Sequence, residues 1–246
     1  MSSSCSVCGG TGFEIRAGSD GVTSAVRCRC ASEDRAARLL ISARIPKRYD
    51  HCSLETFEIQ HPSLDRALAL ARDWIERWPL VDHGLLFLGK PGTGKTHLAV
   101  GIARGLAAAK GARIAFREQR ELLKSLQGTY DSGASLRESE VLAPVMESEV
   151  VILDDLGAGR MTAWSRDVLH DIIVHRYNEE LPLIMTSNHP TGEGESPQGA
   201  SKTPEGLTLR DRLGDALMSR IYEMCLVVEF EGNDYRRGVL HASHRF

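Results

Sequence analysis

A glycine-rich segment of eight residues carries the strongest chemical signal in the sequence. Gly89-Lys-Pro-Gly-Thr-Gly-Lys95-Thr96 fits the pattern GxxxxGK[ST] at every fixed position. The backbone N–H groups of such a loop point at a pyrophosphate, and the N-terminus of the helix that follows adds positive potential. Lysine then reaches the β- and γ-phosphates, and a hydroxyl at the next position coordinates Mg²⁺. The segment predicts an ATP site that contains Gly89, Pro91, Gly92, Thr93, Gly94, Lys95 and Thr96.

Two adjacent carboxylates follow the apolar run 150–153. Asp154 is placed to hold Mg²⁺ through water, and Asp155 to orient and deprotonate the water that attacks ATP. An acidic pair after a strand is more often a helix cap or a turn, but the glycine-rich loop favours the nucleotide interpretation. ATPases of this plan often have Glu at the second position, so the shorter Asp155 predicts slow hydrolysis.

A third polar group follows a later apolar run, in Thr186-Ser187-Asn188. The amide of Asn188 could hydrogen-bond the γ-phosphate or its attacking water from the end of a strand beside the loop. The alternative is an asparagine in the turn before Pro190.

Four of the six cysteines form two close pairs, Cys5/Cys8 and Cys28/Cys30. In a reducing compartment such spacing favours a metal over disulfides, because CxxC and CxC each place two thiolates on one ion. The sequence therefore predicts a Zn²⁺ site that supplies the folding free energy of a small module. Cys52 and Cys225 are predicted to be buried. None of the nine histidines has ligand spacing near the four amino-terminal cysteines, and His97 is predicted to be structural.

Apolar runs and helical periodicities alternate along the rest of the chain. Helices are predicted at 94–109, 117–127, 137–146, 164–179 and 208–222, and a further helix begins with Ser63 as N-cap and ends before Pro79. Strands are predicted at 84–88, 112–116, 149–153, 182–186 and 226–230, and their Val/Ile/Leu runs are typical of a parallel sheet buried on both faces. The fold predicted is an α/β P-loop NTPase with a five-stranded parallel sheet.

Two units are predicted. Residues 1–47 form the zinc module with a connector helix at 32–44, and residues 48–246 form the ATPase domain. The segment 191–206 is rich in Gly and Pro and is predicted to be a surface loop.

The composition excludes several classes. With 246 residues, 42% hydrophobic side chains and a net charge of −3, the chain is neither fibrous nor disordered. Because the overall charge is nearly balanced, nucleic-acid binding must depend on a local patch. The longest apolar runs are too short to span a bilayer, so no membrane contact and a cytoplasmic location are expected.

The order of these motifs resembles the bacterial helicase loaders of DnaC/DnaI type, within the AAA+ ATPases and close to the IstB transposition ATPases. The likeness spans about residues 45–236 and includes Ser-Arg-Ile at 219–221 and the segment 231–236. Its most specific segments are DDLGAGRMTAWSRDVL (154–169), ELPLIMTSN (180–188) and LGDALMSRIYEMC (213–225).

The resemblance implies further roles. Arg220 matches the arginine finger that reaches a neighbouring subunit's γ-phosphate, which implies self-assembly. Arg236 matches the sensor-two arginine, here on a short tail in place of the helical lid. Thr162 and Trp164 match positions in a loop that contacts single-stranded DNA, although Trp164 could equally pack at a helix start.

The resemblance also implies a partner, a replicative helicase of the DnaB type gripped by the amino-terminal module during DNA replication. Two alternatives stay open: an IstB-like transposition helper, and a nucleic-acid adaptor that holds ATP with little turnover. A small-molecule P-loop kinase is disfavoured, because no substrate-binding insertion is found and Asn188 and Arg220 would have no task.

Overall fold

The computed structural model describes residues 5–17, 23–129, 138–192 and 206–236. The surface loop predicted at 191–206 lies outside this part of the chain except at its ends. Within the described ranges, no helix is both long and apolar enough to cross a bilayer.

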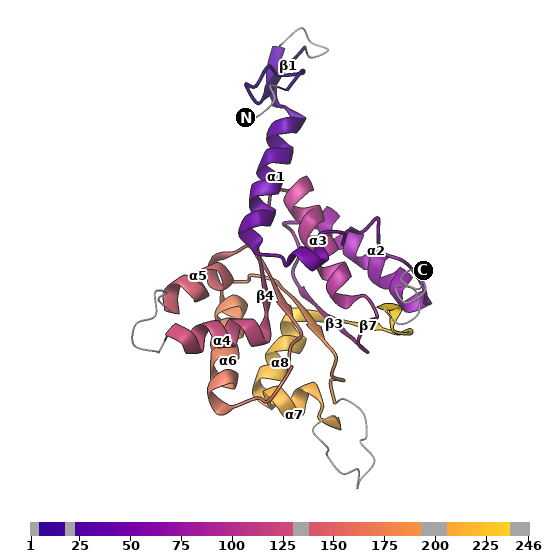
Figure 1. Cartoon of the computed structure of the whole chain (residues 1–246), viewed down its shortest axis with the longest axis vertical. Helices are drawn as coiled ribbons and strands as arrows, with labels where there is room; N and C mark the ends of the chain where they lie inside the picture. Colours follow the sequence, from indigo (N-terminus) through magenta and orange to yellow (C-terminus); the bar gives the residue numbers. More distant parts are fainter. Residues whose placement is uncertain (1–4, 18–22, 130–137, 193–205, 237–246) are drawn as a thin grey trace, which may run out of the picture.

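The centre of the molecule is a parallel sheet of five strands in the order β4-β5-β6-β3-β7 (Figure 1). The strands are β3 (Gly84–Gly89), β4 (Ile114–Glu118), β5 (Val150–Asp154), β6 (Leu183–Ser187) and β7 (Cys225–Phe230). Each lies within two residues of its predicted bounds, so the predicted five-stranded α/β architecture is confirmed. The strand that precedes the glycine-rich loop, β3, lies between β6 and β7.

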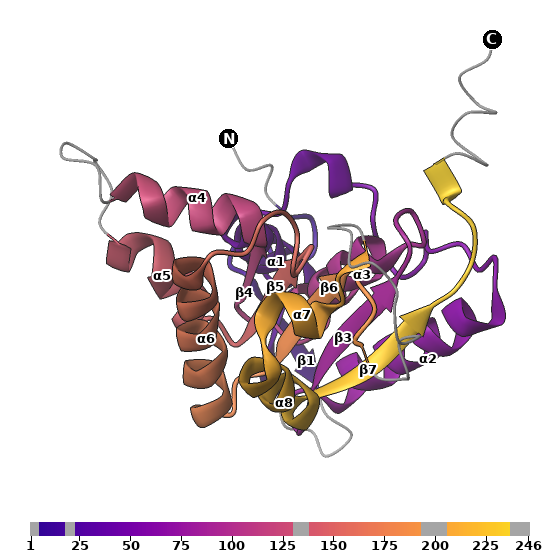
Figure 2. The ribbon, with the colours of Figure 1, turned by 90° about the horizontal axis from the view of Figure 1, so that it is seen from below.

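Helices cover both faces of this sheet (Figure 2). The elements on one face are α2 (Pro62–Arg77) and α3 (Lys95–Ala109); those on the other are α4 (Gln119–Thr129), α5 (Glu138–Glu147), α6 (Ala163–Asn178), α7 (Leu209–Leu213) and α8 (Asp215–Met224). Alternate side chains of β3 enter the two cores: Leu85 and Phe87 face α2 and α3, and Leu86 and Leu88 face the opposite layer. Burial on both faces explains why the strands are continuously apolar.

Most helix ends are shifted by one to three residues from the prediction, and two helices differ in how they begin or continue. The N-cap of α2 is His61, whose side chain accepts a hydrogen bond from the N–H of Ser63, while the Ser63 hydroxyl accepts from the N–H of Glu231 at the end of β7. The single helix predicted at 208–222 is two helices, because Gly214 adopts φ 92° between α7 and α8. Only glycine adopts that backbone conformation readily, so the chain turns there.

The amino-terminal part carries an antiparallel hairpin that the sequence did not predict, made of β1 (Phe13–Ala17) and β2 (Thr23–Arg27). Helix α1 (Arg29–Ala43) follows and holds the hairpin away from the sheet (Figure 1). The carboxyl end of α1 packs against α3 and β4, and Ala43 is fully buried there. A short 3₁₀ turn, Lys47–Tyr49, leads on to the ATPase core.

Candidate nucleotide-binding site

The glycine-rich loop lies at the carboxyl end of β3, where parallel sheets bind their ligands. It leads from Gly89 directly into α3, which begins at Lys95. Gly92 and Gly94 have φ of 81° and 96°, values that a residue with a Cβ rarely adopts. A Cβ on Gly94 would also lie 2.9 Å from Cε2 of Phe57, so these glycines are required both for the turn and for the close packing around it.

The ammonium of Lys95 lies inside the loop. Its Nζ donates to the carbonyl oxygens of Gly89, at 2.7 Å, and Lys90, at 2.8 Å. Burial lowers the pKa of Lys95 from 10.5 to about 8, against the opposing influence of Asp154 and Asp155. A buried cation this close to a glycine-rich turn is suited to bind an anion.

The pKa of Lys95 predicts that ATP binding weakens in alkaline solution. Since the free chain loses the Lys95 proton as pH rises through about 8, only about a tenth of the molecules stay charged at pH 9, and the apparent affinity for ATP should fall about tenfold from pH 7. Calorimetry at pH 9 should detect uptake of about one proton on binding. A Lys95→Arg variant should bind more weakly without this pH dependence, because its guanidinium stays charged. Equal affinity of the wild type at pH 7 and 9 would contradict the assignment.

Thr96 and Asp154 are joined at the loop's edge. The Thr96 hydroxyl donates to Oδ1 of Asp154 at 2.8 Å, and the Thr186 hydroxyl donates to the same oxygen at 2.8 Å. Burial raises the pKa of Asp154, although both hydroxyl bonds oppose that change. The threonine and carboxylate oxygens are hard ligands of the kind that Mg²⁺ takes, and their adjacency fits a cation beside the phosphates.

Asp155 and Asn188 also meet. The side-chain amide of Asn188 donates to Oδ1 of Asp155 at 2.8 Å, and the Asp155 backbone N–H donates to the Thr186 hydroxyl. Asp155 has φ 58°, a left-handed conformation that is uncommon outside glycine. Backbone strain of this kind recurs at functional sites. The structure thus places two of the three predicted catalytic groups directly after β5 and β6, in contact with each other.

The segment after β7 lies against the loop. The N–H of Tyr235 donates to Gly92 O at 3.1 Å, and a Cβ on Gly92 would overlap the carboxylate of Asp234. Arg236 is exposed and close enough to Lys95 to lower the pKa of that lysine. The predicted sensor arginine therefore lies beside Lys95 and the glycine-rich loop of its own chain.

Arg220 is placed differently, on α8 of the opposite layer. Its guanidinium carbon lies 5.9 Å from the centre of the Tyr177 ring of α6. Its Nε has no hydrogen-bond partner within the described part of the chain. This arginine lies on the helix that leads directly into the amino end of β7, whereas Lys95 follows the carboxyl end of β3.

The loop after the acidic pair leads to the predicted DNA-contacting residues. Thr162 is the N-cap of α6 and forms a reciprocal capping box with Ser165. Trp164 is half-buried at the first turn and packs against the core beneath it. The structure brings both residues to one helix start and leaves part of the indole in contact with solvent.

The four amino-terminal sulfurs converge within 4.8 Å of one another. Cys5 Sγ lies 3.8 Å from Cys28 Sγ, and Cys8 Sγ lies 3.4 Å from Cys30 Sγ. A tetrahedral zinc with Zn–S bonds of about 2.3 Å separates its sulfurs by about 3.8 Å. A hydrogen bond from the Gly12 N–H contributes most to lowering the pKa of Cys8 to about 6. The pKa values of Cys28 and Cys30 are raised, so the fit to one Zn²⁺ depends on the four sulfurs and their spacing.

The model of the IstB-like ATP-binding proteins matches residues 29–242. This chain belongs to the IstB-like ATP-binding protein family. It is accordingly an ATP-binding protein with the AAA+ P-loop fold.

Individual relatives of this IstB-like protein include helicase loaders. A crystal structure of the DnaC helicase loader is 34% identical, has a TM-score of 0.64, and covers 76% of this chain and 100% of the other. The replicative helicase loader DnaC of Buchnera aphidicola (subsp. Schizaphis graminum) is 25% identical over 61% of this chain. The matched part also spans 61% of that relative's own length. An ATP-binding protein of insertion sequence IS5376 from Geobacillus stearothermophilus is 29% identical over 75% of this chain and 67% of its own.

The structure adds residues to the site of this IstB-like protein that the sequence did not single out. Gln119, fully buried at the end of β4, accepts from the N–H of Gly157 at 2.7 Å. Arg212 of α7 donates to the carbonyls of Gly157 and Gly159 at 3.0 and 2.8 Å. Both hold the loop that follows Asp155. A polar residue shortly after the strand predicted at 112–116 was the available sequence signal for Gln119.

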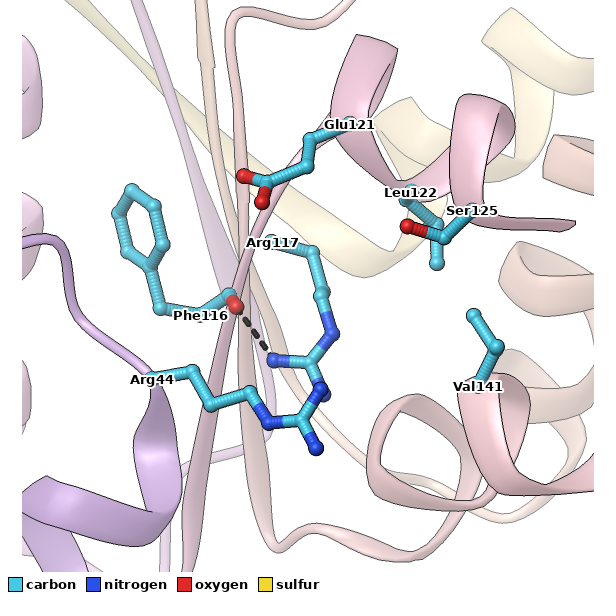
Figure 3. Close-up of a pocket in the computed structure, with 7 residues that line it drawn as sticks. All are labelled: Arg44, Phe116, Arg117, Glu121, Leu122, Ser125 and Val141. Atoms are coloured by element: carbon cyan, nitrogen blue, oxygen red, sulfur yellow. Dashed lines mark hydrogen bonds between the residues drawn. The ribbon is translucent and has the colours of Figure 1, made fainter. Parts of the chain in front are cut away.

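A separate hollow lies between the end of α1, β4 and α4 (Figure 3). Its lining contains two arginines whose guanidinium groups lie next to each other, and burial and then Arg44 lower the pKa of Arg117. The lining residues are Arg44, Phe116, Arg117, Glu121, Leu122, Ser125 and Val141. None of the predicted site residues lines it, so this hollow is distinct from the nucleotide site.

Proposed function

We propose that this protein loads a DnaB-type replicative helicase onto single-stranded DNA, in the cytoplasm, in a cycle driven by ATP. The observation that carries the proposal is the likeness to the DnaC helicase loader, which extends over the whole of that solved chain at 34% identity. The contacts among the predicted site residues support it, because the groups proposed to bind Mg²⁺ lie together and the groups proposed to position water lie together.

In the proposed cycle, ATP lies against Gly89, Pro91, Gly92, Thr93 and Gly94, with its phosphates at Lys95. Thr96 and Asp154 would hold Mg²⁺, which supplies positive charge to the β- and γ-phosphates when bound. Asp155 orients the attacking water and accepts its proton, and Asn188 fixes the Asp155 carboxylate through the bond already present. The one methylene by which Asp155 is shorter than Glu makes unstimulated hydrolysis slow.

Stimulation comes from assembly. Arg220 lies on a face away from its own Lys95, so it serves as an arginine finger for a neighbouring copy of this chain. Arg236 contacts the nucleotide of its own chain. Loss of the γ-phosphate removes the differential contacts that favour the assembled state, and the helicase is released.

The amino-terminal unit, residues 1–47, is proposed to grip the helicase. Zn²⁺ on Cys5, Cys8, Cys28 and Cys30 holds this small unit together. Around that cluster Val7, Phe13 and Ile15 expose 67%, 52% and 74% of their surface. Apolar side chains gathered on a module that projects from the core are typical of a protein-binding surface.

Single-stranded DNA is proposed to contact Thr162 and Trp164. A Trp164→Ala variant should bind single-stranded DNA about 5- to 150-fold more weakly, because stacking one base on an aromatic ring contributes about 1–3 kcal/mol. Fluorescence anisotropy with a labelled oligonucleotide measures the change. Trp164→Phe should retain most of the affinity, and Leu80→Ala, at a residue exposed elsewhere, should retain all of it. If Trp164→Ala binds single-stranded DNA as tightly as wild type, the indole does not contact DNA and serves only in packing.

Co-purification of the full chain with the host helicase tests the proposed partner. We expect the helicase to be recovered with ATP and released with ADP. Recovery of a transposase and no helicase would instead support the second candidate, a transposition helper. That candidate has its own support, since the family model is IstB-like and the IS5376 protein is 29% identical over 75% of this chain.

The rate of phosphate release from ATP distinguishes an adaptor with little turnover from both of these candidates. The proposed loader should release phosphate from ATP faster when single-stranded DNA and helicase are present. A rate that neither partner changes would favour the adaptor.

A further inference from the structure

Three side chains of types that bind metals converge on α3 directly after the glycine-rich loop, separate from the four-cysteine cluster. One ligand atom each from His51, Cys52 and His97 lies within 4.8 Å of the others. Cys52 Sγ is 3.7 Å from His51 Nε2, and the rings of His51 and His97 are 5.8 Å apart at 85°. With Zn–S near 2.3 Å and Zn–N near 2.0–2.1 Å, a tetrahedral zinc separates sulfur and nitrogen ligands by about 3.5 Å.

The segment 51–56 is held tightly on α3. His97 Nε2 lies 3.0 Å from Ser53 O and 3.2 Å from Thr56 Oγ1, and Thr56 Oγ1 donates to His51 O at 2.8 Å. One helical turn beyond His97 stands Gly101, where a Cβ would come within 2.9 Å of the Leu54 side chain. The small residue permits this close approach, so the three ligands are brought together before any ion binds.

The hydrogen bond at Ser53 also fixes the tautomer of His97. A carbonyl oxygen can only accept, so Nε2 carries the proton and Nδ1 of the neutral ring keeps its lone pair. Metal-ligating histidines almost always donate their other ring N–H to a carbonyl, a carboxylate or water. Coordination through Nδ1 would leave the Ser53 bond intact.

We propose that His51, Cys52 and His97 bind one Zn²⁺, with water as the fourth ligand. One thiolate with two imidazoles is a donor set that suits this borderline-soft cation. Cys52 is 2% exposed while His51 is exposed, so the ion enters from the His51 side and the thiol proton leaves to solvent. Arg104, the cation near Cys52, is paired with Asp50 at 3.4 Å.

Such a site ties the segment before α2 to α3 at a position two residues after Lys95. The assignment is independent of helicase loading, because it depends only on the three ligands and their contacts.

The test is the zinc content of the full chain after incubation with ZnCl₂ and dialysis against metal-free buffer. Wild type is expected to hold two zinc ions per chain, one of them on the four cysteines, and His51→Asn only one. His170→Asn, a matched change of a partly exposed histidine on α6, should keep two. Circular dichroism checks that each variant is folded.

A second measurement replaces zinc with Co²⁺. The wild-type spectrum minus that of His51→Asn should contain a thiolate-to-cobalt charge-transfer band, which Cys52→Ser should also lack. The proposal is wrong if His51→Asn holds as much zinc as wild type, if His170→Asn loses the same ion, or if the difference spectrum has no thiolate band. Should Cys52→Ser fail to fold, the His51→Asn and His170→Asn pair still decides the outcome.

Discussion

Replacement of Lys95 by alanine is expected to reduce ATP affinity about 30- to 5,000-fold. Lys95 is 5% exposed and two carbonyls inside the loop hold its ammonium, so the ammonium should meet the phosphates with little water between them. Removing one partner of a buried, hydrogen-bonded charge pair costs about 2–5 kcal/mol. Isothermal titration calorimetry with ATP and MgCl₂ gives the affinity directly.

A matched control separates this effect from general loss of positive charge. Lys124→Ala removes an exposed lysine of α4 and should bind ATP as wild type does. Thermal unfolding supplies a second readout, because ATP should raise the Tm of wild type and of Lys124→Ala but leave Lys95→Ala unchanged. If Lys95→Ala binds ATP with wild-type affinity, the assignment of the nucleotide to the glycine-rich loop is wrong.

Replacement of Arg220 by alanine is expected to leave ATP affinity unchanged and to lower assembly-stimulated hydrolysis by about 10³-fold or more. An arginine finger stabilises the charge that develops on the transferred phosphoryl group and contributes on the order of 10³–10⁵ in kcat. The guanidinium lies on α8 over Tyr177, away from its own Lys95, so binding by the isolated chain does not involve it. Phosphate release with helicase and DNA present is the measurement.

Mixing experiments show whether Arg220 acts between molecules. Lys95→Ala lacks a working phosphate site but keeps its finger, and Arg220→Ala has the opposite defect. A mixture of the two should hydrolyse ATP faster than either variant alone. Arg72→Ala, at an exposed arginine of α2, is the control and should behave as wild type. Normal stimulated hydrolysis by Arg220→Ala in the assembled complex would contradict the finger assignment.

Local sequence patterns predicted most of the fold because each signal acts over few residues. Continuous apolar runs fixed all five strands of the central sheet to within two residues, and the P-loop pattern fixed the junction of β3 and α3. Asp155 and Asn188 directly follow β5 and β6, and their side chains are hydrogen-bonded to each other. Topology alone brings such strand ends together, so the site could be assembled from the residues before any distance was known.

Contacts between distant segments escaped prediction because no local pattern encodes them. Gln119 and Arg212 hold the loop after Asp155 from 38 and 55 residues away. His97 seemed unrelated to the cysteines, yet it lies beside Cys52 because a loop 44 residues earlier packs on α3. The break at Gly214 was missed for a different reason, since the helical periodicity continues through it.

Helicase loading itself is measured by the amount of DnaB-type helicase retained on circular single-stranded DNA. We expect retention with the wild-type chain and ATP, and little retention with Lys95→Ala or without the chain. Equal retention in all three mixtures would contradict helicase loading by this chain.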